Sequence, residues 1–116
     1  MNPATRQPNP VQGFLLTFFT QQDHRHHGKP LAHWLVDQAR AMGVGGATLI
    51  SASEGFGHHH RLHRVHLIDF SEQPQEVVMA VTAAEADRLL AKISAEHIRV
   101  VYTRTPVEFG TTGDMG

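Results

Sequence analysis

The chain has 116 residues, enough for one domain with a single hydrophobic core. Its formal net charge is −1 with histidine neutral, which gives no sign of a nucleic-acid partner. The absence of cysteine excludes disulfides and thiolate metal sites, and it fits a cytoplasmic protein.

The two ends have the composition of flexible chain. Residues 1–12 contain three prolines and no hydrophobic region, which is typical of a disordered arm rather than a signal peptide. Residues 106–116 are predicted to be a flexible tail. No apolar run approaches the ~18 residues of a spanning helix, so no membrane insertion is expected. These patterns predict one folded domain at 13–105.

The first half of this domain alternates strand and helix patterns. Gly13–Thr20, with the sequence GFLLTFFT, is short and aromatic-rich and predicts a strand. From Pro30 onward apolar residues recur at helical spacing, and Gly43 suits the end of that helix. Gly46–Ser53 predicts a second strand.

The second half repeats the alternation. Arg64–Phe70 is strand-like, Ser71–Gln75 breaks the pattern, and Glu76–Thr82 predicts a strand. Thr82 and Glu85 predict a capping box at the start of a second helix. Ile98–Thr103 predicts the last strand. The residues expected to face inward from the second helix are Ala86, Leu89, Leu90 and Ile93.

This order of elements predicts a ferredoxin-like βαββαβ sandwich, in which two helices cover one face of a four-stranded antiparallel sheet. The first strand, however, is apolar on both faces, because Phe14, Leu16 and Phe18 alternate with Leu15 and Phe19. A second apolar face in water would be an unusually large exposed patch. We therefore expect an oligomer assembled sheet to sheet.

Two histidine-rich segments, Asp23–Lys29 and His58–His66, follow the ends of predicted strands. The first lies at a helix start, where free backbone N–H groups and the helix dipole favour an anion. Lys29 adds a positive charge, and Arg61 and Arg64 carry planar groups suited to phosphate oxygens. The two segments could line one anion pocket, especially across a subunit boundary.

A metal site is a second interpretation of the same histidines. Neutral imidazole binds zinc, nickel or copper. His58 with His60, and His24 with His26, are spaced by two residues, so each pair would share one face of a strand. A merely solvated loop is the third interpretation.

Signals for catalysis are weak, and no enzyme activity is expected. Ser51 and Ser53 lack a nucleophile elbow, although histidines are plentiful. The GFGHHHR stretch lacks the ending of a Walker phosphate loop. A small hydrolase therefore remains only a minor alternative.

The motifs also resemble those of the domain of unknown function 190 family, which belongs to the PII-like group of signal proteins. The resemblance covers about residues 14–102. It is carried by HGKPL at 27–31, GATLISASEGFG at 46–57, RLH at 61–63, IDFSEQP at 68–74 and EVVMAVT at 76–82.

The resemblance implies a ferredoxin-like homotrimer that binds adenine nucleotides, such as AMP, ADP, ATP or cyclic-di-AMP, at clefts between subunits. It also implies a T-loop, here at about 57–75, that responds to the ligand and docks on a regulatory target such as a transporter or an enzyme. Among the expected nucleotide-binding residues, the resemblance implies Gly55, Phe56, Gly57 and Arg104. The phosphate role of the others is inferred from their chemistry, and these are His27, Gly28, Lys29, Arg61 and Arg64.

Two departures from the PII pattern bear on function. The predicted T-loop has no tyrosine, because Tyr102 is the only one in the chain, so regulatory uridylylation is not expected. The histidine density is high. This could indicate a response to metal ions, as in the similarly folded CutA-type divalent-cation tolerance proteins. A histidine-rich metal-binding protein is therefore the alternative function.

Overall fold

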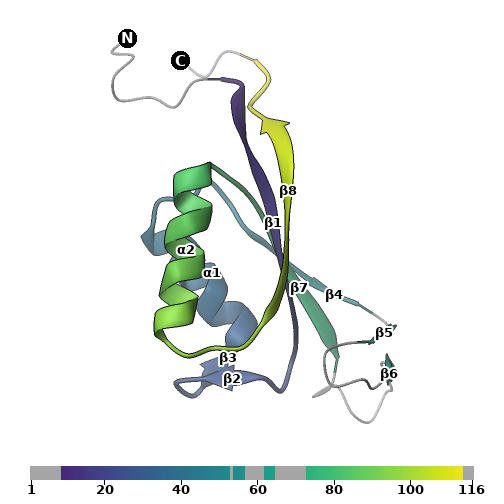
Figure 1. Cartoon of the computed structure of the whole chain (residues 1–116). Coiled ribbons are helices and arrows are strands. Elements are labelled where there is room, and N and C mark those ends of the chain that lie inside the picture. The colour runs from purple at the N-terminus through teal and green to yellow at the C-terminus, as the bar shows by residue number, and fades with distance from the viewer. Residues whose placement is uncertain (1–8, 53, 57–61, 65–72, 114–116) are drawn as a thin grey trace.

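The computed structural model describes residues 9–52, 54–56, 62–64 and 73–113. Four strands form one antiparallel sheet in the order β4-β7-β1-β8, and both helices lie on one side of it (Figure 1). This arrangement confirms the ferredoxin-like prediction. The sheet and helices are β1 Val11–Gln21, α1 Leu31–Ala41, β4 Thr48–Ser51, β7 Pro74–Val81, α2 Ala83–Ala95 and β8 Val101–Phe109.

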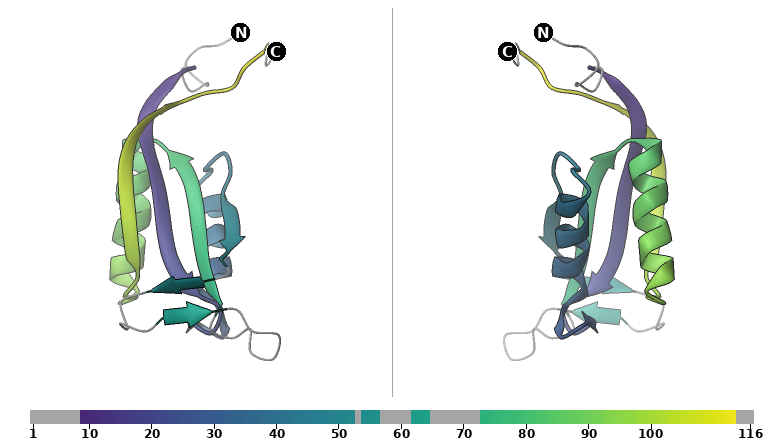
Figure 2. Two further views of the ribbon diagram at one scale, coloured as in Figure 1. Left: turned by 90° about the vertical axis from the view of Figure 1, so that its right-hand side faces the viewer. Right: turned by 90° about the vertical axis from the view of Figure 1, so that its left-hand side faces the viewer.

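Two short hairpins complete the described structure. Strands β2 (Arg25–His26) and β3 (Lys29–Pro30) pair just before α1, and β5 (Glu54–Phe56) pairs with β6 (Leu62–Arg64). Both hairpins lie at the same end of the molecule, opposite the chain termini (Figures 1 and 2). The first histidine-rich stretch and the described strands β5 and β6 therefore lie at one end of the fold.

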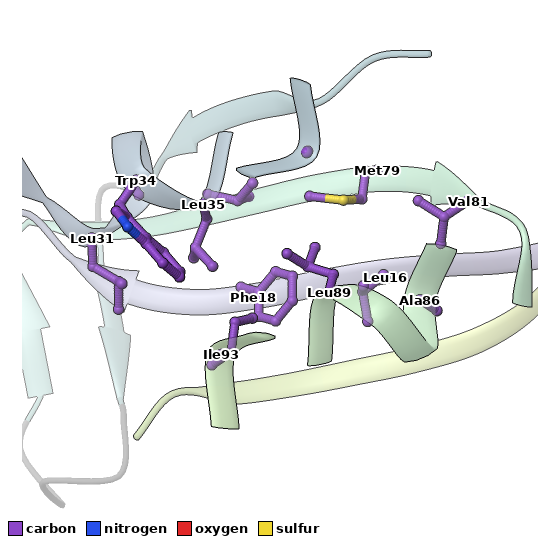
Figure 3. Packing of buried hydrophobic residues seen from close by; sticks show 13 residues of the cluster. Leu16, Phe18, Leu31, Trp34, Leu35, Met79, Val81, Ala86, Leu89 and Ile93 are labelled. Carbon is purple, nitrogen blue, oxygen red and sulfur yellow. The ribbon is translucent and has the colours of Figure 1, made fainter. Parts of the chain in front are cut away.

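The hydrophobic core lies between the sheet and the two helices (Figure 3). Alternate residues of β1, including Leu16 and Phe18, point into it and are fully buried. The two helices supply the opposite wall with side chains such as Leu35 and Leu89. The helix pattern seen in the sequence is thus confirmed, with Leu90 only partly buried at the edge of the core.

The helix ends follow local rules. Thr82 and Glu85 form the expected capping box, with Thr82 Oγ1 accepting from the Glu85 N–H at 3.1 Å. After α1, Gly43 has a φ of +81°, and its N–H and that of the next residue bond back to helix carbonyls. His97 takes the same position after α2 with a φ of 57°, where glycine is usual.

Several predicted boundaries were wrong. The last strand begins at Val101 rather than Ile98, because the Ile98 N–H bonds to the Ile93 carbonyl at 3.3 Å and finishes the helix end. Strand β7 begins at Pro74, which pairs with Gln21, although a break was expected there.

Pairing also extends beyond both ends of the predicted segment 13–105, since Val11 of β1 is opposite Phe109 of β8. Of the predicted strand Arg64–Phe70, only Arg64 lies in a described strand. Residues 65–70 lie outside the described part of the chain.

The second face of the sheet is left open in a single chain. Phe19 and Val101 are neighbours on this face and are 38% and 43% exposed. Leu15 and Ile50 contribute further exposed apolar surface to it.

Neither α1 nor α2 has the length and apolar character that crossing a membrane requires.

Replacing Leu89 by alanine should lower the free energy of unfolding by about 2–5 kcal/mol, because a fully buried side chain would leave a cavity. Urea denaturation followed by circular dichroism measures this change. Arg88→Ala, at the exposed neighbouring position, should change the free energy by no more than about 0.5 kcal/mol. Equal effects of the two substitutions would contradict this account of the core.

Candidate functional site

The β2–β3 hairpin presents His27 and Gly28 at its tip. Both have positive φ, 52° and 78°, which is the signature of a type I′ turn. Arg25 Nη1 donates to the Gly28 carbonyl at 3.1 Å across the turn. His27 is left with 71% of its side chain exposed.

The hairpin is tied to the start of α1. The Leu31 N–H donates to the His24 carbonyl at 2.7 Å, and Pro30, at the helix cap, has no N–H. Two of the four amides that an α-helix start normally leaves free are therefore not available to an anion. An anion here would have to rely more on side chains and the hairpin tip than the sequence suggested.

Behind the hairpin tip, two imidazoles converge on one carboxylate. His26 Nε2 lies 3.0 Å from Glu96 Oε1, and His27 Nε2 lies 3.1 Å from the same oxygen. The His26 ring meets the Trp34 ring edge-on, with centroids 4.9 Å apart. This contact and its 16% exposure fix His26 more firmly than His27.

Glu96 is positioned by the end of α2, where it is the C-cap residue. Hydrogen bonds from His26 and then His27 hold the pKa of its carboxyl below the usual value. Lys92 Nζ lies 3.8 Å from the second oxygen, Oε2. The carboxylate is therefore charged at neutral pH, and its two oxygens face different partners.

Lys29 points along α1 and forms an ion pair with Asp37, with Nζ 2.7 Å from Oδ2. Arg40 Nη1 lies 4.0 Å from the other oxygen of this carboxylate. The lysine hydrogen bond is the main cause of a lowered Asp37 pKa. Because both partners are about half exposed, the pair is weak and could be exchanged for another anion.

Arg104 lies elsewhere, on β8 and on the helix side of the sheet. Its Nη1 donates to Asp87 Oδ1 at 2.9 Å, and its guanidinium lies 4.2 Å from the centre of the Phe14 ring. Asp87 is in the second turn of α2, whereas Glu96 closes that helix at its far end. Within one chain, Arg104 is thus not part of the cluster of His26, His27 and Glu96.

The remaining candidates lie at or beyond the β5–β6 hairpin. Gly55 and Phe56 are in β5, and Arg64 is opposite Glu54 in the pairing. His24 does not take part in the His26 cluster described above; its ring Nδ1 lies 3.3 Å from Thr20 Oγ1. The candidates outside the described residues are Ser53, Gly57, His58, His60 and Arg61.

Glu96 was not among the residues singled out in the sequence. It is separated from His26 by 70 positions, so no local spacing connects the two. The edge contact of Trp34 with His26 likewise has no signal in the local sequence. Only the packing of α2 beside the hairpin reveals these partners.

Lys29→Met should raise the pKa of Asp37 toward its ordinary value, because the main hydrogen-bond donor is lost. A lowered folded-state pKa gives stability that is present above the unfolded pKa and is lost as pH falls through the folded one. The stability difference between the unaltered protein and the variant should therefore shrink below about pH 4. Carboxyl NMR titration measures the pKa, and Lys92→Met is the control that should leave it unchanged. An unaltered Asp37 pKa in Lys29→Met would contradict the ion pair.

The fold is similar to that of several solved protein structures. A PII-like signalling protein of Thermus thermophilus matches with a TM-score of 0.65 and 21% identity, over 89% of this chain and 94% of that one. CPII of Thiomonas intermedia K12, in a complex with ADP and bicarbonate, matches with a TM-score of 0.63 and 22% identity, over 89% and 93% of the two chains.

Sequence comparison gives the family. A UPF0166 protein of Aquifex aeolicus (strain VF5) is 30% identical over 88 residues, which are 75% of this chain and 84% of the relative. The family model of DUF190, described as an uncharacterized ACR, matches residues 13–109. The chain therefore belongs to the DUF190 family and has the fold of the PII-like signalling proteins.

Proposed function

We propose that this protein is a PII-like sensor that binds an adenine nucleotide at clefts between subunits. The main observation behind this proposal is that the β2–β3 hairpin and strand β5, after which the predicted T-loop begins, lie at one end of the fold. Each carries residues suited to phosphate. CPII, which shares the fold, has been solved with ADP, AMP and bicarbonate bound.

The phosphates would be held by the hairpin tip at His27 and Gly28, by Lys29, and by Arg61 and Arg64. Lys29 is suited to this role because its exposed pair with Asp37 costs little to exchange. The adenine would lie against apolar strand-edge residues near Phe56, beside the glycines at 55 and 57.

Arg104 would take part in this site from a neighbouring subunit. In its own chain it contacts Asp87 and the Phe14 ring, on the β8 side of the molecule. A phosphate group could compete with Asp87 for the guanidinium, since Asp87 is 67% exposed. A site completed by two chains would make nucleotide binding depend on assembly.

The assembly we propose is a homotrimer formed through the open face of the sheet. Leu15, Phe19, Ile50 and Val101 each leave more than a third of their surface exposed on a single chain. Burying them against other copies would remove an apolar patch from water.

The T-loop, at about 57–75, would report the ligand to a protein target such as a transporter or an enzyme. A ligand that contacts the loop in its ordered state favours that state by the difference in contact energy. Binding is then the whole activity, and no catalytic step is required.

Adenine nucleotides should raise the melting temperature of the protein, by an amount corresponding to about 2.7 kcal/mol at a hundredfold excess over the dissociation constant. Thermal-shift measurements with AMP, ADP, ATP and cyclic-di-AMP test this. Lys29→Met should weaken binding roughly tenfold by removing a charge-assisted hydrogen bond. Lys92→Met is a matched control, because the two lysines are 49% and 50% exposed. No shift with any of the four nucleotides would overturn the proposal.

Sedimentation equilibrium should give three times the mass of the 12.9 kDa chain. Leu15→Glu should reduce this to one chain, because three buried carboxylates would face an apolar interface. Arg88→Glu, on the exposed side of α2, should leave the mass unchanged. A single-chain mass for the unaltered protein would contradict the trimer.

A further inference from the structure

We propose that His26, His27 and Glu96 form a binding site for a divalent transition-metal ion, with zinc as the best match. Of the histidine pairs that the sequence suggested, the site uses only His26. It combines a donor from the end of β2 and one from the hairpin turn with a third from the end of α2. Two imidazole nitrogens and one carboxylate oxygen are a donor set that zinc commonly takes.

The geometry is already close to that of a metal site. One ligand atom from each of His26, His27 and Glu96 lies within 4.8 Å of the other two. In a tetrahedral zinc site, bonds of about 2.1 Å separate the ligand atoms by roughly 3.4 Å. The two histidine–glutamate distances, 3.0 and 3.1 Å, are near this value. The exposed His27 side chain would supply any remaining adjustment by a change of torsion.

The backbone explains how two consecutive histidines reach the same point. In an extended strand, neighbouring side chains point to opposite faces. His27 instead adopts a φ of 52° in the turn, and its ring centroid lies 4.1 Å from that of His26. Left-handed backbone is unfavourable for most non-glycine residues, and asparagine is the usual occupant of this turn position.

The surroundings hold His26 in place, leave His27 adjustable and orient Glu96. His26 is held by the edge of Trp34 and is largely buried. His27 is mostly exposed, so its ring can turn toward an ion, and water can reach the remaining coordination position. Lys92 lies beside Oε2 of Glu96, which leaves Oε1 as the oxygen that faces the histidines.

Metal binding would exchange hydrogen bonds for coordinate bonds at the same atoms. Each ring now has Nε2 beside the carboxylate, where a proton on that nitrogen donates to Oε1. In the metal complex each neutral ring carries its proton on Nδ1 and binds through the Nε2 lone pair. The ion would join the hairpin to the end of α2, at the end of the fold where the predicted T-loop begins.

The two left-handed histidines provide a matched test. His27 and His97 have φ values of 52° and 57°, so asparagine, which tolerates this conformation, should be accepted at either position. Each substitution removes one of the ten histidines, so binding elsewhere on the chain contributes equally to both variants. His97 immediately follows Glu96 but is not one of the proposed ligands.

Zinc titration of the full chain by calorimetry, without nucleotide, should show one tight site per chain in the unaltered protein and in His97→Asn. His27→Asn should weaken that site at least tenfold, and Glu96→Gln should do the same. Circular dichroism without metal should be the same for all four proteins. Equal zinc affinities for His27→Asn and His97→Asn, or no tight site at all, would overturn the proposal.

Glu96→Gln also separates this inference from the proposed nucleotide function. Glu96 is not a proposed nucleotide contact, so this variant should lose the tight zinc site and keep the thermal shift with nucleotide. A protein that binds zinc through these residues but no nucleotide would refute only the sensor proposal. Nucleotide binding with zinc affinity unaffected by Glu96→Gln would refute only the metal site.

Discussion

The register of the central strand β1 is the constraint on which the other elements depend. It pairs with β7 from Phe14 to Gln21 and with β8 from Val11 to Phe19. Because side chains alternate, this register directs Leu16 and Phe18 into the helices and leaves Leu15 and Phe19 on the open face. A slip of one residue would exchange the two faces, so both core packing and the proposed assembly require the same pairing.

The position of the candidate site follows from this sheet. Where β1 ends, the Gln22 N–H donates to the Gln73 carbonyl at 2.9 Å, and the chain then turns into the β2–β3 hairpin. Helix α2 starts at the Thr82 capping box directly after β7 and ends at Glu96. The length and packing of α2 therefore decide which side chain meets His26. The cluster results from two elements that the sheet brings to one end.

Charged groups at this end are held by exchangeable partners. Lys29 pairs with Asp37, and Glu96 accepts from two imidazoles and lies near Lys92. Such partly exposed pairs contribute little net stability, since solvent screens them and side-chain entropy opposes them. Their partners can therefore be replaced by a phosphate or a metal ion at low cost. The same property would suit the proposed sensor, whose predicted T-loop begins at this end of the fold.

The sequence by itself determined the order and type of the main elements, because hydrophobic periodicity, the Thr82–Glu85 box and Gly43 are local signals that act within a few residues. The two-sided apolar pattern of β1 also predicted its exposed face. Only the tertiary structure decided that β8 continues through Pro106, which a strand tolerates because β8 is at the sheet edge and needs no N–H there. It likewise decided the meeting of His26 and His27 with Glu96, since contacts across about 70 residues depend on how the helix packs and leave no spacing in the chain.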